Sequence, residues 1–359
     1  MEGDFNITDV ASNGNRLVFV ATAEDDDREI QNVYELNLEN KEFRKLTENG
    51  GSISSLCVTQ DGTVAFTGHM EGTKPWANEK LIMPEKNISV EIGKSVGNSI
   101  GSDSFASGGQ SLIYDGGKYY LIAQDGGYAS VYSWDGNVHK ISQGERVVQS
   151  IAVSSGKLGF IYSSPEKPSV ILFDGELDLN PEIHGRKPVR ISSGESEGWL
   201  ILTDRRNPTV LFIHGGPQTA YGYAYYIEFN YLASNGFNVL YANPRGSSGY
   251  GEKFARGCVG DWGGSDMQDL LDILDRSVEV YSLADRVAVS GGSYGGYMVN
   301  TIITKTDRFK CAVSERSISN LLSMCGTSDI GFWFNPEEIS VADPWSKAGV
   351  ERMMEFFPI

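Results

Sequence analysis

Hydrophobic and polar residues alternate in short runs through the first half of the chain, and turn residues separate these runs. The same order occurs four times between residues 5 and 185: two strands joined by a glycine-containing turn, a loop, and two more strands. The third strands begin near Val33, Leu81, Val131 and Val170, at spacings of 48, 50 and 39 residues. Four strands per repeat at this period are typical of β-propeller blades. The pattern predicts an all-β propeller of about four blades, with an antiparallel sandwich as the alternative.

The hydrophobic pattern changes near residue 186. Residues 265–278 carry apolar side chains at helical spacing, with Ser265 as the expected N-cap, and a second helix is predicted over 294–304. Strands that alternate with helices predict a mostly parallel sheet with both faces covered. Active sites in such sheets lie at the carboxyl ends of the strands. Continuous apolar runs suit buried strands at five places: 198–202, 209–213, 237–241, 285–292 and 309–315.

A candidate nucleophile lies in the stretch VSGGSYGGYM, residues 289–298. Gly291-Gly292-Ser293-Tyr294-Gly295 fits the pattern GxSxG and stands between a predicted strand and a predicted helix, which is the context of a nucleophile elbow. The sharp turn exposes the serine oxygen, and the following helix directs its positive end at developing negative charge. Ser293 is therefore the predicted nucleophile.

A glycine pair in His214-Gly215-Gly216-Pro217 directly follows the predicted strand at 209–213. We expect a backbone N–H of this pair and that of Tyr294 to form an oxyanion hole. In an α/β-hydrolase, the chain order is nucleophile, acid and then histidine. All four histidines precede Ser293. We therefore expect His214 to support the loop rather than to act as the base.

Composition narrows the function classes. The formal net charge is −17, and residues 1–185 hold 27 acidic against 14 basic side chains. Such a balance repels phosphates, so nucleic acid is not an expected partner. The four cysteines show no CxxC spacing, which favours free thiols and a cytoplasmic location. There is no signal-like N-terminus, no apolar run of membrane-spanning length and no metal-ligand spacing, so neither a membrane nor a metal or cofactor is expected.

Five motifs within residues 212–334 resemble those of the prolyl oligopeptidase family of serine peptidases, and of its acylaminoacyl-peptidase-like branch in particular. They stand in family order: FIHGGPQTAYG, NPRGSSGYGEKF, GDWGGSDMQDL, GGSYGGYM and ERSISNLLSMCGTSDIGFWF. The resemblance implies a propeller that covers an α/β-hydrolase domain and restricts access to small peptides.

The resemblance also implies roles for single residues. It makes Ser293 the nucleophile and Gly216 and Tyr294 the backbone oxyanion donors. It places three aromatic residues near the pocket for the side chain before the scissile bond, with plain core packing as the alternative: Phe332, Trp333 and Phe334. Structural roles are implied for Arg245, Asp261 and Trp262, whereas Arg316 and Asp329 receive no catalytic role.

The chain departs from the family pattern in two ways. The family's triad aspartate and histidine follow the region where this chain stops, and the family propeller has seven blades where four are visible here. We therefore expect an internal fragment of a longer peptidase that lacks its triad Asp and His and is inactive by itself.

The leading hypothesis is a serine peptidase that hydrolyses small peptides, of the acylaminoacyl-, dipeptidyl- or oligopeptidase type, through an acyl-enzyme on Ser293. A carboxylesterase and a non-catalytic propeller binding protein are the alternatives. We expect propeller blades over residues 1–185 and a hydrolase domain over 186–359, with a boundary within about ten residues of Gly185. The expected partners are a peptide substrate, a second copy of the chain, or a complementing C-terminal chain.

Overall fold

The structure is a computed structural model, and it describes residues 6–22, 29–106 and 108–358. The chain forms two compact units. Unit 1 consists of Met1–Asn98, Ala106–Tyr162 and Ser169–Leu179, and unit 2 of Ser99–Phe105, Ser163–Pro168 and Asn180–Ile359. The predicted boundary near Gly185 stays a prediction, because two short segments of the first half cluster with unit 2.

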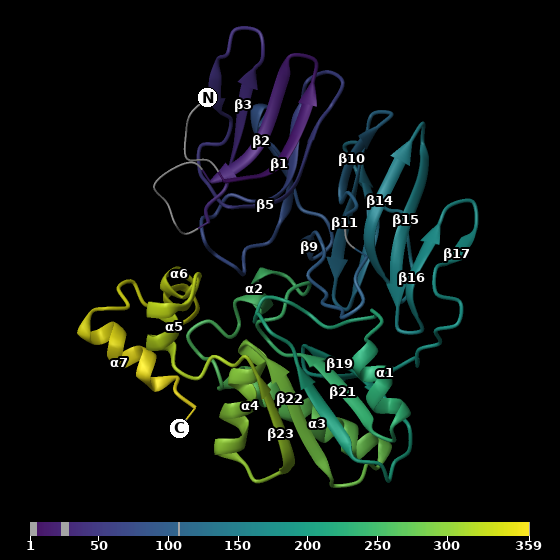
Figure 1. Cartoon of the computed structure of the whole chain (residues 1–359), viewed down its shortest axis with the longest axis vertical. Helices are drawn as coiled ribbons and strands as arrows, with labels where there is room; N and C mark the ends of the chain where they lie inside the picture. The colour runs from purple at the N-terminus through teal and green to yellow at the C-terminus, as the bar shows by residue number, and fades with distance from the viewer. Residues whose placement is uncertain (1–5, 23–28, 107, 359) are drawn as a thin grey trace. The chain divides into compact units, whose positions relative to one another are not determined.

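Unit 1 consists of four antiparallel four-stranded groups, and these are the predicted repeats (Figure 1). The first two are separate sheets. The third and fourth are joined by one parallel pair, Ala129 with Val147. In chain order the groups are β1 (Asn6–Asn13), β2 (Arg16–Thr22), β3 (Asn32–Asn37) and β4 (Phe43–Lys45); β5 (Ser52–Val58), β6 (Val64–His69), β7 (Lys80–Met83) and β8 (Ile88–Val90); β10 (Leu112–Asp115), β11 (Lys118–Asp125), β12 (Tyr128–Trp134) and β13 (Val138–Lys140); and β14 (Val147–Ser154), β15 (Lys157–Ser164), β16 (Lys167–Leu172) and β17 (Glu176–Asp178). A two-residue strand, β9 (Ser95–Val96), pairs with β11, and a 3₁₀ turn occupies Pro84–Lys86.

Neighbouring sheets of unit 1 bury hydrophobic side chains against each other. Val18 and Val33 of the first sheet share one core cluster with Leu56 and Phe66 of the second. Leu81 of the second sheet shares another cluster with Leu112 and Leu121 of the third. Face-to-face packing of successive four-stranded sheets is the arrangement of propeller blades, which confirms the predicted fold of this half.

Unit 2 is built on a six-stranded sheet in the order β18-β19-β21-β20-β22-β23 (Figure 1). The pairs among β21, β20, β22 and β23 are parallel, whereas β18 and β19 join in antiparallel fashion. The strands are β18 (Val189–Ser193), β19 (Ser196–Ile201), β20 (Thr209–Ile213), β21 (Asn238–Asn243), β22 (Val287–Gly292) and β23 (Phe309–Glu315). The helices are α1 (Ile227–Ser234), α2 (Glu252–Ala255), α3 (Ser265–Tyr281), α4 (Tyr294–Lys305), α5 (Leu321–Thr327), α6 (Gly331–Glu338) and α7 (Lys347–Glu355).

Alternation along β20 directs its side chains to two different helical layers. Leu211 and Ile213 lie in one cluster with Leu270 of α3 and Met298 of α4. Phe212, on the opposite face, has its ring 4.6 Å from that of Phe229 on α1. The sheet is therefore covered on both faces, as the alternating pattern predicts.

The prediction that Ser265 caps α3 is wrong. The N-cap position is Gly264, which has no side chain to accept a hydrogen bond, and Ser265 is the first helical residue. The Asp261 carboxylate, four residues upstream, accepts the hydrogen bond from the Ser265 N–H at 2.9 Å. Local sequence reading missed this because the acceptor lies outside the usual cap position.

Segments of the first half join unit 2 through side-chain caps. The Asp103 carboxylate accepts hydrogen bonds from the N–H groups of Ile227 and Glu228, at 2.7 and 2.9 Å, at the start of α1. The Ser163 hydroxyl accepts one from the Tyr225 N–H at 2.9 Å. The two Asp103 bonds satisfy N–H groups of the first turn of α1, which have no partner within the helix.

Candidate active site

Ser293 occupies a strained turn between β22 and α4. Its backbone has φ 59° and ψ −123°, a conformation that side-chain-bearing residues rarely adopt. Two backbone bonds hold it there. The Ser293 N–H donates to the Glu315 carbonyl at 3.0 Å, and the Tyr297 N–H donates to the Ser293 carbonyl at 2.9 Å. This strand–turn–helix geometry is that of a nucleophile elbow.

The glycines of the motif are required by close backbone contacts. A Cβ on Gly295 would lie 2.2 Å from the Ile213 carbonyl oxygen, and one on Gly291 would lie 2.8 Å from the same atom. A Cβ on Gly296 would lie 2.8 Å from the Glu315 carbonyl oxygen. The turn is therefore packed between β20 and β23, with no room for side chains.

The predicted oxyanion loop lies beside the nucleophile. β20 runs parallel to β22, with Ile213 opposite Gly291, so both segments leave the sheet at the same edge. A Cβ placed on Gly215 would lie 3.5 Å from Ser293 Cβ and 4.0 Å from Ser293 Oγ. Tyr294 is the first residue of α4, where backbone N–H groups have no partner within the helix. The assignment of Gly216 and Tyr294 as the two donors stays a prediction.

His214 supports this loop through both ring nitrogens. Nδ1 lies 2.6 Å from the Gly215 carbonyl and 3.1 Å from Thr219 Oγ1, and Nε2 lies 2.9 Å from Ser247 Oγ. Burial lowers the pKa of His214 to about 4, so the ring is neutral near pH 7. A buried, neutral histidine with both nitrogens engaged holds the loop in place and is not free to take a proton from Ser293.

No general base contacts the nucleophile within the part of the chain that the structure describes. No hydrogen bond joins a described side chain to Ser293 Oγ. The other histidines lie elsewhere: His69 accepts from the Glu71 N–H, His139 lies 3.3 Å from Asp135, and His184 lies 3.5 Å from Lys167 Nζ. Among the described residues, the site therefore consists of the strained Ser293 turn and the neighbouring glycine loop, with no side chain hydrogen-bonded to the Ser293 hydroxyl.

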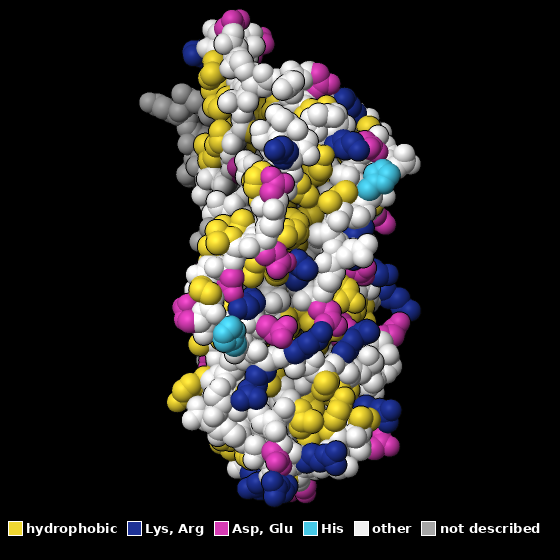
Figure 2. Space-filling model, turned by 90° about the vertical axis from the view of Figure 1, so that its right-hand side faces the viewer, with side chains coloured by type: hydrophobic (Ala, Val, Ile, Leu, Met, Phe, Trp, Pro, Cys, Tyr) yellow, Lys and Arg dark blue, Asp and Glu magenta, His cyan; other side chains and the backbone are white. Residues whose placement is uncertain are grey.

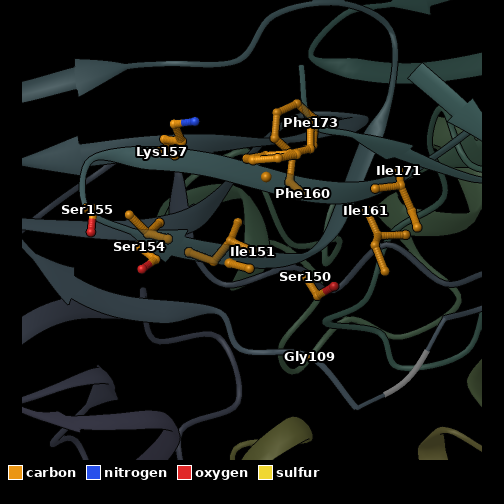
Figure 3. A pocket seen from close by; sticks show the side chains of 13 residues that line it. Gly109, Ser150, Ile151, Ser154, Ser155, Lys157, Phe160, Ile161, Ile171 and Phe173 are labelled. Carbon is orange, nitrogen blue, oxygen red and sulfur yellow. The ribbon is translucent and has the colours of Figure 1, made fainter. Parts of the chain in front are cut away.

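A separate groove lies in unit 1 along β14–β16 (Figure 3). It has a volume of about 780 Å³, and the described residues that line it include no histidine, cysteine or carboxylate. Its walls are mainly apolar: Ile151, Val153, Phe160, Ile161, Ile171 and Phe173. Ser150, Ser154 and Ser155 also line this groove, but they lie on β14 and its turn to β15 with no start of a described helix beside them, so the candidate active site is the one at Ser293.

Comparison with known proteins agrees with this geometry. Residues 1–168 match the family described as "Acylaminoacyl-peptidase, N-terminal beta-propeller domain", and residues 223–359 match the "Prolyl oligopeptidase family". The chain belongs to the prolyl oligopeptidase family of serine peptidases.

Relatives within the prolyl oligopeptidase family cover this chain to different extents. The "Uncharacterized peptidase YuxL" of Bacillus subtilis is 36% identical over 247 residues, 61% of this chain and 38% of that protein. Dipeptidyl aminopeptidase BIII of Pseudoxanthomonas mexicana is 37% identical over 159 residues, 42% of this chain and 23% of that protein. The structure of a Pyrococcus horikoshii acylaminoacyl peptidase superposes with a TM-score of 0.83 at 26% identity, covering 98% of this chain and 58% of that one. This chain thus spans less than two thirds of the length of these relatives.

The three aromatic residues expected near the substrate pocket lie on α6. Phe334 is 8% exposed, and its ring centroid lies 6.2 Å from that of Trp262 and 5.9 Å from that of Trp333. Trp333 is partly buried against the same core, and Phe332 is half-buried. Phe334 therefore packs in the core, and a pocket role for the three residues stays a prediction.

Two other family-typical residues have clear structural surroundings. The Arg245 guanidinium forms a two-pronged ion pair with Asp269, with both N···O distances 2.8 Å. Arg316 pairs with Glu315 at 3.1 Å, and a Cβ on Gly292 would lie 2.8 Å from the Arg316 guanidinium carbon. Arg316 thus lies beside the nucleophile turn.

Two carboxyl groups near this site are buried, which the sequence pattern does not predict. Asp266 and Glu338 are both 0% exposed, and burial raises their pKa values to about 7 and about 8. Glu338 Oε2 accepts a hydrogen bond from Trp262 Nε1 at 3.1 Å. Aspartate and glutamate side chains are mostly exposed in proteins, so the sequence predicts exposed carboxylates at both positions. Only the tertiary contacts show that these two are buried.

Neither a metal site nor a membrane span is indicated by the described residues. They contain no group of three or more His, Cys, Asp or Glu side chains that could hold an ion. Nor does any described helix combine the length and hydrophobicity that crossing a membrane requires. On one face of the molecule, Lys and Arg side chains are interspersed with Asp and Glu (Figure 2). The acidic excess is therefore not gathered into a single patch on that face.

Proposed function

We propose that Ser293 is the nucleophile of a serine peptidase that cleaves short peptides, of the acylaminoacyl or dipeptidyl type. The observation that carries the proposal is the strained Ser293 turn, packed within 3.5 Å of a Cβ position on Gly215. Acyl transfer needs hydrogen-bond donors about 3 Å from the developing oxyanion. The Gly215–Gly216 loop and the start of α4 both lie beside Ser293.

The reaction proceeds through an acyl-enzyme. Ser293 Oγ adds to the scissile carbonyl carbon while a base takes the hydroxyl proton. The backbone N–H groups of Gly216 and Tyr294 stabilise the oxyanion, and the C–N bond breaks as the leaving amine receives that proton. Water then adds to the ester by the same route and releases Ser293. The described residues supply the nucleophile and the donor loop, and a complementing polypeptide with an aspartate and a histidine supplies the base.

The test is active-site labelling and peptide hydrolysis. Loss of the base costs a serine protease about 10⁶-fold in kcat. We therefore expect no measurable hydrolysis of acyl-peptide or peptidyl-nitroanilide substrates by this chain alone, and little labelling by a fluorophosphonate. Extending the chain with a segment that carries the family's aspartate and histidine, together with further propeller blades, should restore both. The control, Ser293→Ala in the extended chain, should abolish them again.

One outcome would reverse part of this proposal. Turnover by the chain alone that disappears in its own Ser293→Ala variant would show that residues 1–359 contain a base. His214 would then be the first residue to examine. To act as the base, its ring would have to break its contacts with Ser247 and Thr219.

A further inference from the structure

The buried face of α3 carries two carboxyl groups near its start. Asp266 is 0% exposed and Asp269 is 8% exposed, and their spacing of three residues places them on the same side of the helix. Burying a carboxylate is costly unless hydrogen bonds compensate for the lost water. The partners of these two groups should therefore reveal why they are buried.

Asp266 binds the residue that follows the nucleophile. The Tyr294 hydroxyl donates to Asp266 Oδ2, and the Met267 N–H donates to Oδ1 at 2.8 Å. Tyr294 is itself fully buried, and the Trp262 ring packs edge-on against it at 4.9 Å. Because the N–H of Tyr294 is a proposed oxyanion donor, Asp266 holds the side chain of a residue whose backbone acts on the substrate.

Asp269 binds the loop that supports the other oxyanion donor. Its carboxylate accepts three hydrogen bonds from Arg245, two from the guanidinium at 2.8 Å and one from the backbone N–H at 2.9 Å. The same loop continues to Ser247, whose hydroxyl lies 2.9 Å from His214 Nε2, and to Ser248, whose N–H donates to the Thr219 carbonyl at 3.0 Å. Asp269 is thus connected to the Gly215–Gly216 loop through two further contacts.

We infer that Asp266 and Asp269 are a pair of positioning residues that hold the two oxyanion donors at a fixed spacing, with α3 as their common support. Hydrogen bonds weaken steeply when their angle falls below about 120°, and an oxyanion needs its donors about 3 Å away. One helix that binds both the Tyr294 side and the Gly216 side restricts movement of the donors. This inference rests on the proposed function, because it assigns the pair a role toward the oxyanion.

The test uses Ser293→Cys as a reporter that requires no general base. A thiol beside free N–H groups at a helix start has a pKa below the usual value of about 8.5. The pKa of Cys at position 293 is measured on the whole chain from the rate of iodoacetamide alkylation against pH. Mass spectrometry of the peptide separates it from Cys57, Cys258, Cys311 and Cys325, which are all free thiols.

In this background we compare Tyr294→Phe, Asp266→Asn and Asp269→Asn. If the pair positions the donors, each variant raises the thiol pKa by about 0.5 unit, the size of a helix-terminus contribution. If the carboxylates act only as nearby negative charges, Asp266→Asn and Asp269→Asn lower that pKa, because less negative charge favours the thiolate. A fall, or no change in any of the three variants, would overturn the inference.

Controls separate this result from unfolding and from failure of the proposed function. Asp272→Asn removes a partly exposed carboxylate of α3 that accepts a hydrogen bond from Gln268 Nε2, and it should leave the thiol pKa unchanged. Should Asp269→Asn unfold, Arg245→Lys tests the same contact, since it keeps the charge but loses the two-pronged bond. A thiol pKa of about 8.5 in Ser293→Cys alone would instead contradict the oxyanion assignment, and with it the proposed function.

Discussion

At the scale of single residues, the nucleophile turn depends on glycines that touch neighbouring backbone. Gly295 is the sharpest case, since its Cβ position lies 2.2 Å from the Ile213 carbonyl oxygen and 2.8 Å from that of His214. Both contacts are to backbone atoms of β20 and the residue that follows it, and these atoms cannot rotate away as a side chain can. Ser293 therefore keeps its conformation only while this contact stays free of a side chain.

We expect Gly295→Ala to destabilise the fold by about 1–3 kcal/mol, because the added methyl group forces the turn away from β20. The free energy of unfolding is measured by urea titration. Gly101→Ala is the matched control within unit 2, because its nearest atom is the Ala220 carbonyl oxygen at 4.0 Å, and it should change stability by less than about 0.5 kcal/mol. Equal effects of the two substitutions would contradict the packing argument.

At the scale of secondary structure elements, a buried acid attaches α6 to the segment before α3. Glu338 ends α6; its side chain accepts from Trp262 Nε1 at 3.1 Å, and its carbonyl accepts from the Gly260 N–H at 2.7 Å. Burial raises the pKa of Glu338 to about 8. The group is therefore mostly protonated and neutral in the folded state at pH 7.

The raised pKa of Glu338 predicts that the folded state becomes less stable as pH rises. The folded-state pKa of Glu338 lies above its unfolded value, so its contribution is fully present below the unfolded pKa and is lost as pH rises through about 8. Between these limits, stability falls by up to about 1.4 kcal/mol per pH unit. We expect Glu338→Gln, which cannot ionise, to have a shallower fall than the unsubstituted chain in urea unfolding at pH 6, 7, 8 and 9. Asp266 titrates in both proteins, so the difference between the two slopes reports on Glu338, and identical slopes would contradict its assignment.

At the scale of the whole molecule, the hydrolase sheet has an edge that is open within the described residues. β23 pairs only with β22, and residues 311–315 of this strand are exposed, including Val313 at 47%. An exposed edge strand offers unpaired N–H and C=O groups to a strand of another chain. A second copy of this chain carries the same edge and is the partner that we propose.

We expect the isolated chain to self-associate, with a mass above that of the 39.3 kDa monomer in sedimentation velocity or light scattering. Val313→Lys places a charge on this exposed edge strand and should shift the distribution toward monomer. Val280→Lys, at an equally exposed position of α3, is the matched control and should leave the distribution unchanged. A monodisperse monomer at all accessible concentrations would contradict the prediction.

Local patterns in the sequence predicted the elements whose signals are regular. The third strands expected near Val33, Leu81, Val131 and Val170 correspond to β3, β7, β12 and β16. The elements around Ser293 also follow the pattern, because strand and helix periodicity depends on neighbours within one or two turns. The short helices α5–α7 were not predicted: α6 has little amphipathic pattern and contains Pro336.

Long-range contacts decided the rest of the site. Asp266 and Tyr294 are 28 residues apart, Arg245 and Asp269 are 24 apart, and Trp262 and Glu338 are 76 apart. No periodic pattern records that such pairs meet, and an acidic residue near a helix start suggests exposure unless its partner is known. The sequence by itself determined the glycine-lined turn at Ser293 and the alternation of strands and helices, because these depend on nearby residues. Only the tertiary structure decided that α3 turns two carboxyl groups inward, toward Tyr294 and Arg245, because burial and hydrogen bonding arise when distant segments pack together.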